Sequence, residues 1–245
     1  MPEQLWFTAI LNRLFAAPVT AVLRMLHIEP HHPQAPITNS SAMEILVLLF
    51  LIAMFLLIRS RLSVDRPGGM QHITEIIHGF VADQAHEIIG HHSEKYVAFL
   101  SALGIFILAC NLIGLIPGLE SPTGATASVP LGCALVAFGY YNLQGLRQHG
   151  LWGYFKHFTG PMPALAILML PIEIVSHLAR LLSLTVRLWA NIFAGDLITL
   201  VFFSMIPIGV PVIFNGLHIV VAFLQAYVFM LLSTIYIAGA VAEEH

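Results

Sequence analysis

The chain has 245 residues, of which 58% are hydrophobic and only 9% are charged, and its mean hydropathy is +0.86. Soluble domains carry about 25% charged residues, so this composition predicts an integral membrane protein. The net charge of −3 and the lack of a basic run exclude nucleic-acid binding.

The first 40 residues contain no stretch long enough to cross a membrane without interruption. Residues 3–28 form two apolar pieces separated by Pro18, and each piece is shorter than the roughly 20 residues that a span needs. We expect two short interfacial helices there, with Trp6 as an anchor. Residues 29–40 hold three prolines, a composition typical of a loop.

A single membrane domain is expected from residue 41 to residue 245. Its first span, at about 41–58, is followed directly by Arg59, Arg61 and Arg66. Positive residues mark the cytoplasmic end of a span, so residues 1–40 are expected outside the cytoplasm. At about 73–89, apolar residues recur at helical spacing with polar residues between them. This pattern predicts an amphipathic helix on the cytoplasmic surface.

Four further apolar stretches complete the predicted domain. Those at about 96–116 and 129–146 are each about long enough to cross once, and we expect them to form a hairpin. As single helices, 163–206 and 208–242 would be about 66 Å and about 52 Å long, against a hydrocarbon core of about 30 Å. Strong tilt resolves this mismatch. The fold class is therefore all-α, with about five crossings and a cytoplasmic C-terminus.

A polar stripe follows one face of the apolar segment from Pro171 to Leu197. At about 100° per residue its members lie within a sector of about 80°. They are Glu173, His177, Arg180, Arg187 and Asn191. An arginine at bilayer depth costs several kcal/mol, so Arg187 must face protein or water and is a candidate functional residue. Asp196 lies about two and a half turns beyond Arg187, which turns it away from the stripe and toward a different partner.

The stripe also has a purely structural interpretation, as a buried ion-pair network that fixes helix packing. Glu173 and His177 stand at i and i+4 and would satisfy it. Arg187 fits it poorly, because no acidic residue lies within one turn of it in the sequence. Its charge must be balanced by another helix or another chain.

Several short motifs in the second half of the chain follow the order found in a known family. One is S-L-x-x-R-L-x-x-N-x-x-A-G, which begins at Ser183 and ends at Gly195. Another is H-x-x-x-x-x-x-Q at His218 and Gln225, in the last span. Upstream matches are Gln71, Glu75, Gly79, Asn111, Gly114, Leu115 and Pro117. In these positions the chain resembles subunit a of the F-type ATP synthase, from about residue 40 onward.

The chain departs from the pattern of that family at a few positions. Leu181 stands where a proline often follows the basic residue, and Trp189 and Ala190 stand where a Phe-Gly pair is common. Asp196 replaces a more usual glutamate or histidine, and its side chain is one methylene shorter than that of glutamate. None of these changes affects the arginine.

The resemblance implies the stator subunit of the synthase's membrane sector, with proton passage through two offset half-channels. Arg187 would be the essential arginine that faces a carboxylate on a rotating ring of hairpin subunits. The expected residues are Asn191, Asp196, His218 and Gln225 in the outside half-channel, and Glu173, His177, Arg180 and Ser183 in the cytoplasmic one. The imidazoles suit a proton relay because histidine changes charge near neutral pH.

The resemblance also implies the surroundings of the chain. Its partners would be the rotor ring, the b-type subunits of a peripheral stalk and, through that stalk, the soluble head of the synthase. Its location would be the bacterial inner membrane, where the two long C-terminal helices would form a near-horizontal hairpin.

Two other functions were open to a membrane chain rich in histidine. The run HEIIGHH at 86–92 comes near a zinc-protease motif, but that motif needs histidines at i and i+4, and position 90 is glycine. A secondary ion transporter with its own midplane site is the remaining alternative. Such transporters usually show two related halves, and the sequence has no internal repeat. Neither G-x-x-x-x-G-K-[ST] nor G-x-G-x-x-G occurs, so we expect no nucleotide site, no other cofactor and no metal.

Overall fold

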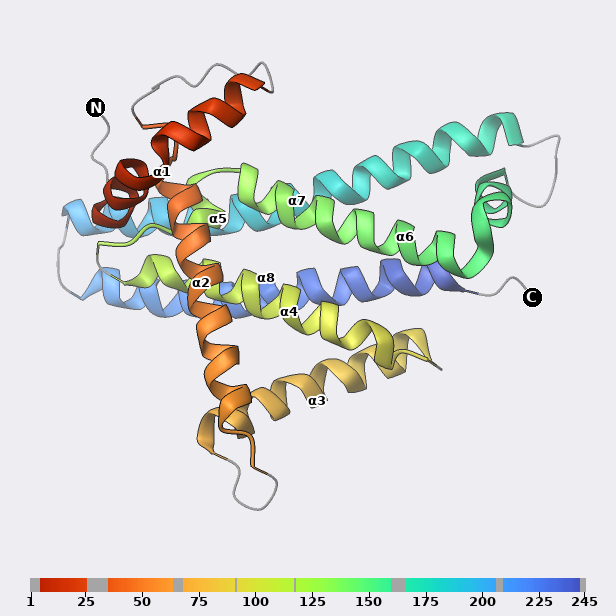
Figure 1. Cartoon of the computed structure of the whole chain (residues 1–245), viewed down its shortest axis with the longest axis horizontal. Coiled ribbons are helices and arrows are strands. Elements are labelled where there is room, and N and C mark those ends of the chain that lie inside the picture. The colour runs from red at the N-terminus through yellow and green to blue at the C-terminus, as the bar shows by residue number, and fades with distance from the viewer. Residues whose placement is uncertain are drawn as a thin grey trace.

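The computed structural model describes residues 5–25, 35–63, 68–90, 92–116, 118–159, 166–205 and 209–242. Within these ranges the regular structure is helical, with no strand (Figure 1). The elements are α1 (Trp6–Met25), α2 (Asn39–Ser60), α3 (Gly69–Ile89), α4 (Glu94–Leu112), η1 (Ile113–Leu115), α5 (Pro122–Ala125), α6 (Ser128–Thr159), α7 (Ala166–Met205) and α8 (Val210–Val241). The prediction of an all-α membrane protein is confirmed.

The N-terminal segment differs from the expectation. In place of two short pieces, α1 is one helix of 20 residues that continues through Pro18. Proline removes one backbone hydrogen bond and can kink a helix without ending it, so the prediction of a break at Pro18 was wrong. By length and composition alone, α1 could also cross a membrane.

The contacts of α1 place it across the start of α2. The Leu5 amide donates to Asn39 Oδ1, at 3.3 Å, and Asn12 exchanges two hydrogen bonds with the backbone of Ile37, each at 3.0 Å. Leu5, directly before α1, and Asn12, seven residues later within it, therefore reach the same short stretch before and at the start of α2. An antiparallel partner of α2 would instead contact it along its length.

Helix α2 fits the predicted first span closely. Thr38 caps its start, because the threonine hydroxyl oxygen accepts a hydrogen bond from the Ser41 amide at 3.3 Å. In Figure 1, α2 crosses α7 and α8 at a steep angle. A membrane that α2 crosses upright would therefore hold α7 and α8 strongly tilted.

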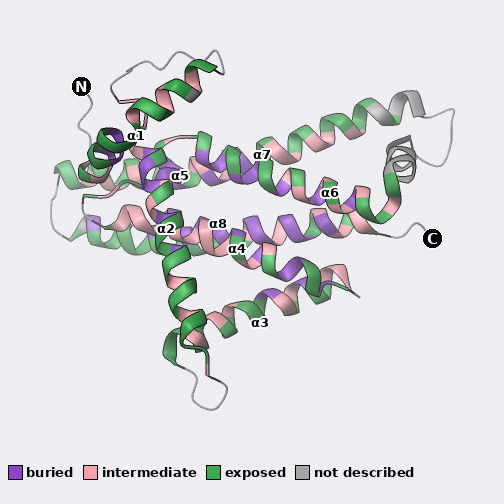
Figure 2. Ribbon diagram, viewed as in Figure 1, coloured by how far each residue is buried: buried purple, intermediate pink, exposed green. Residues whose placement is uncertain are grey.

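Helices α4, α6, α7 and α8 share the main core. Its buried residues include Ile107 of α4, Ala134 of α6, Leu188 of α7 and Phe229 of α8. Figure 2 shows the buried positions gathered where these helices and α5 meet, whereas α1 and the far end of α2 are largely exposed. Within the long segments expected at 163–206 and 208–242, α7 is one continuous helix of 40 residues and α8 one of 32. Positions 163–165, 206 and 208 lie outside the described residues.

Five helical stretches of the described chain are long and apolar enough to cross a membrane. They lie in α1, α2, α4 with η1, α7 and α8. The stretch expected at 129–146 does form a helix, as part of α6, but it is not one of the five. The number of candidate spans thus agrees with the prediction while one member differs. Helix α3 matches the predicted amphipathic helix: Val81 and Ala85 are buried, and Ile73, Ile76 and Phe80 are exposed.

The segment between α4 and α6 contains a short helix, α5, in addition to a turn. The short helix α5 packs against α7, α2 and α4. The sequence analysis predicted only that the two flanking stretches form a hairpin, and it missed the inserted helix.

Candidate functional site

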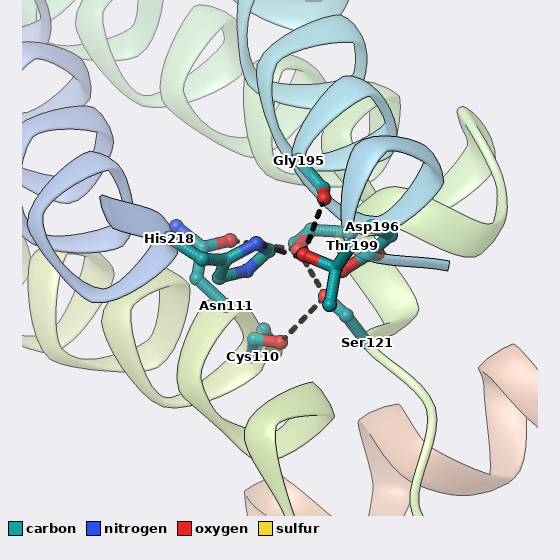
Figure 3. Close-up of polar contacts among 8 residues, drawn as sticks. Cys110, Asn111, Ser121, Gly195, Asp196, Thr199 and His218 are labelled. Carbon is teal, nitrogen blue, oxygen red and sulfur yellow. Dashed lines mark hydrogen bonds and ion pairs between the residues drawn. The ribbon is translucent and has the colours of Figure 1, made fainter. Parts of the chain in front are cut away.

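A carboxylate and an imidazole meet between α7 and α8. The Oδ1 atom of Asp196 lies 3.6 Å from Nδ1 of His218, and Figure 3 shows the two side chains pointing toward each other. The His218 side chain is only 3% exposed, whereas that of Asp196 is 44% exposed. The pair therefore joins the interior of the bundle to its surface.

Gly195 makes this approach possible. A Cβ atom at position 195 would lie 2.7 Å from His218 Nδ1, closer than real Cβ atoms come to other heavy atoms. Gly124 of α5 lies just as close to the Asp196 carboxylate, because a Cβ atom at position 124 would lie 2.6 Å from Asp196 Oδ2. Two glycines from different elements thus flank the carboxylate.

The second ring nitrogen of His218 has no hydrogen-bond partner among the described residues. Its Nε2 atom is buried and makes no hydrogen bond with any described residue. Buried polar atoms are nearly always hydrogen-bonded to protein or water, so this nitrogen marks a position where a buried water molecule would be stabilised.

A cavity of about 400 Å³ lies on the exposed side of Asp196. Its lining includes Glu120, Ser121 and Gly124 together with Asp196 and Leu197. Glu120 is itself exposed. The cavity is therefore large enough for several water molecules and has carboxylates in its wall.

Polar side chains beside this cavity hold α5 in place. Asn111 Nδ2 donates to the Ala222 carbonyl at 3.3 Å, and Asn111 Oδ1 accepts from the Thr123 hydroxyl at 2.7 Å. Ser121 donates to the Cys110 carbonyl at 3.1 Å (Figure 3). Asn111 was expected only as a family match, and neither Ser121 nor Thr123 was expected at the site. The available signal was a pair of small hydroxyl residues in the Ser-Pro-Thr-Gly run between two apolar helices.

Arg187 is partly exposed on α7, and Nη2 donates to the hydroxyl of Ser183 one turn earlier, at 3.1 Å. No carboxylate of the described residues lies within ion-pair distance of it. Leu184 and Leu188, its neighbours on the inner face of α7, are buried in the core. The guanidinium therefore stands at the edge of the bundle with its charge unbalanced by the described part of the chain.

A second polar cluster lies about two to four turns before Arg187 on α7. His177 Nε2 is 3.5 Å from Glu173 Oε1, as the i, i+4 spacing indicated. On its other side His177 Nδ1 is 2.7 Å from the hydroxyl of Tyr141, a residue of α6 that the sequence analysis did not single out. Arg180 lies over the ring of Tyr236, with its guanidinium carbon 5.3 Å from the ring centroid.

Two predicted residues stand apart from these clusters. Asn191 is exposed on α7, and Gln225 is buried on α8 two turns after His218. Neither makes a hydrogen bond with the other candidate residues in the described ranges. Over the same ranges, no three histidine, cysteine, aspartate or glutamate residues are grouped in a way that could hold a metal ion.

The chain has clear relatives among characterised families. The family described as "ATP synthase A chain" matches residues 41–238. The ATP synthase subunit a of Koribacter versatilis is 54% identical over 245 residues, which is 100% of both chains. That of Solibacter usitatus is 53% identical over 214 residues, covering 87% of this chain and 91% of the relative. The subunit a 1 of Syntrophotalea carbinolica is 44% identical over 200 residues, covering 82% and 84%.

A family match over most of the chain and a full-length relative at 54% identity agree with the membrane-length helices of the fold. The chain is a multi-pass membrane protein and belongs to the family of subunit a of the F-type ATP synthase, a component of a multi-subunit complex in the lipid bilayer.

Proposed function

We propose that this chain is the stator of the proton path in its ATP synthase. In this role it provides two half-channels that end at different depths, and Arg187 separates them. A proton enters through one half-channel, rides on a carboxylate of the rotor ring, and leaves through the other. The ring turns as a result.

The observation that carries the proposal is the isolation of Arg187. A guanidinium in a membrane helix is costly unless an opposite charge or water balances it. The described part of this chain supplies a serine hydroxyl and no carboxylate. An acidic side chain on a partner subunit would complete the site, and a ring of c-type hairpins with a buried carboxylate meets that need.

The chemistry of arginine suits a barrier between two channels. A guanidinium keeps its proton throughout the physiological pH range, so it cannot itself pass protons on. It does favour the ionised form of a carboxylate that approaches it. A rotor carboxylate would therefore release its proton on one side of Arg187 and could not carry it past.

For the outside half-channel we propose Asp196, His218, Asn191 and Gln225. Support comes from the Asp196–His218 pair, the cavity of about 400 Å³ at Asp196 and the unpartnered Nε2 of His218. An imidazole beside a carboxylate can take up and release a proton near neutral pH. Asn191 and Gln225 would hydrogen-bond water along the rest of the path.

For the cytoplasmic half-channel we propose Glu173, His177, Arg180 and Ser183. Support comes from the Glu173–His177 pair and from the hydrogen bond that links Ser183 to Arg187. These side chains form a polar path along α7 from the arginine toward the start of the helix.

We also propose the orientation and the remaining partners. The three arginines after α2 favour a cytoplasmic end there, and α1 lies across the opposite end of α2. The N-terminus would then be outside and the C-terminus in the cytoplasm of a bacterial cell, with b-type stalk subunits holding the chain against the rotating ring.

The test is Arg187→Lys in the assembled synthase, reconstituted in vesicles. Lysine keeps the positive charge but loses the planar fork of donors that fits a carboxylate. We expect proton-driven ATP synthesis to fall by far more than tenfold, while the amount of assembled chain stays unchanged. Arg61→Lys, an exposed position after α2, is the matched control and should behave as wild type. Synthesis retained in Arg187→Lys would refute the proposed role.

A further inference from the structure

His177 is held from two sides by residues of α6. The Tyr141 hydroxyl lies 2.7 Å from Nδ1, and the two rings stack with centroids 5.8 Å apart at 21°. Phe138, one turn earlier on α6, packs edge-on against the same imidazole with centroids 6.0 Å apart. These contacts fix both the position of the ring and the direction in which each nitrogen points.

The Nε2 side of the His177 imidazole faces Glu173. Nε2 of His177 is 3.5 Å from Glu173 Oε1, and the His177 and Glu173 side chains are 12% and 37% exposed. Tyr141 is buried. The three residues therefore form a row from the interior of the bundle to its surface, with the histidine between a hydroxyl and a carboxylate.

We propose that Tyr141 is a positioning residue for proton release, acting through His177. The proposal rests on the proposed function of the chain and adds a residue of α6 to the cytoplasmic half-channel. The Tyr141 oxygen accepts a hydrogen bond from Nδ1–H, which leaves Nε2 as the one basic nitrogen, facing Glu173. A proton binds at Nε2 and leaves from Nε2 to the carboxylate or to water, and no other bond forms or breaks.

The hydrogen bond between Tyr141 and His177 need not change while His177 gains and loses a proton. Nδ1 carries a proton in the imidazolium and in this neutral tautomer alike, so the bond to Tyr141 persists in both states. If the hydroxyl donated to Nδ1 instead, it would have to turn each time the imidazole became charged. A fixed donor–acceptor geometry is what a rapid relay requires.

Other charged and titratable groups face this site from the packed elements. Glu173 does so from α7 itself. Tyr236 of α8 lies beside Tyr141, with ring centroids 5.9 Å apart, and Arg180 lies over the Tyr236 ring. The Tyr236 hydroxyl makes no hydrogen bond within the described ranges, which makes Tyr236 a matched control for Tyr141.

The experiment compares Tyr141→Phe with Tyr236→Phe in the whole synthase, reconstituted in vesicles. ATP synthesis is measured while the pH is varied on the cytoplasmic side with the outside pH fixed, and then the reverse. We expect Tyr141→Phe to slow synthesis by about two- to tenfold, the range of one net hydrogen bond, and to shift the cytoplasmic-side pH profile. The outside profile should not move. Tyr236→Phe should leave both profiles as in wild type.

A second variant covers the case in which Tyr141→Phe does not assemble. His177→Phe keeps an aromatic ring between Phe138 and Tyr141 and removes both nitrogens. This variant should make ATP synthesis slower and remove its dependence on the cytoplasmic-side pH. In this background, adding Tyr141→Phe should have no further effect, because the hydroxyl no longer has a nitrogen to orient.

Three results would overturn the proposal: unchanged profiles in Tyr141→Phe, equal slowing by Tyr141→Phe and Tyr236→Phe without a pH shift, or an added effect of Tyr141→Phe in the His177→Phe background. Failure of the proposed function would look different. Arg187→Lys would then retain synthesis, whatever the tyrosine variants do.

Discussion

At the scale of single residues, the contact between Asp196 and His218 depends on the lack of a side chain at position 195. Gly195 lies inside α7, where alanine would be the better helix former. Its lack of a Cβ atom lets the His218 ring reach α7 beside Asp196, since an added Cβ would lie 2.7 Å from Nδ1. The imidazole is buried and cannot easily move away. The glycine therefore sets the distance across which a proton would pass.

Gly195→Ala should separate His218 from Asp196 and slow proton-driven ATP synthesis by about tenfold or more, a barrier change of at least about 1.4 kcal/mol. The control is Gly216→Ala, two residues before His218, where an added Cβ meets nothing within 4 Å. That change should leave the rate of ATP synthesis unchanged, because the added methyl group contacts nothing. Within a helix, alanine is more stable than glycine by about 0.5–1 kcal/mol, so the fold should not suffer either. Equal rates in the two variants would show that the close approach has no functional role.

The sequence predicted contacts within one helix better than contacts between neighbouring helices. Helical spacing was enough to bring Glu173 and His177 together and to separate Asp196 from the stripe. It carried no information about Tyr141, because a tyrosine in an apolar helix is equally typical of core packing. Only the packing of α6 on α7 shows that its hydroxyl meets His177.

At the scale of elements, α5 is a four-residue helix held by its side chains. Thr123 is fully buried and donates to Asn111 Oδ1, which has no other hydrogen bond in the described chain. Such a short helix has little stability of its own. Its position was not predictable from local sequence, because it depends on partners that lie on α2, α4 and α7.

Thr123→Val should test how firmly α5 is held. Valine matches the shape of threonine but leaves the buried Asn111 oxygen unpaired, at a cost of about 1–3 kcal/mol. We expect the solubilised synthase to lose this chain at a lower temperature than wild type. Thr126→Val is the control, since among the described residues the Thr126 hydroxyl bonds only the exposed Ser128. If the two variants lost the chain at the same temperature, the Asn111 contact would contribute little.

At the scale of the whole molecule, the two polar clusters lie at opposite ends of one helix. Glu173 and Asp196 are 23 residues apart on α7, or about 35 Å along the axis, and Arg187 stands between them. A hydrocarbon core is about 30 Å thick, so a strongly tilted α7 would keep both clusters within reach of the bilayer at different depths. The sequence predicted both this length and, from its mismatch with the bilayer, the strong tilt, and the steep crossing of α2 over α7 in Figure 1 agrees with that prediction.

The identity of the transported ion is also a property of the whole molecule and its partners. Each elementary charge that crosses the membrane is worth about 2.3 kcal/mol per 100 mV, so several must cross for each ATP. Both proposed half-channels contain an imidazole within 3.6 Å of a carboxylate, His177 with Glu173 and His218 with Asp196. Imidazole nitrogen binds protons readily, whereas a hard cation such as Na⁺ prefers oxygen ligands.

We therefore expect a pH gradient to drive ATP synthesis in vesicles with Na⁺-free buffer, at a rate that added Na⁺ does not raise. If synthesis began only after Na⁺ was added, the two histidines would have to be hydrogen-bonding side chains of a sodium path, and the role of Arg187 would still stand.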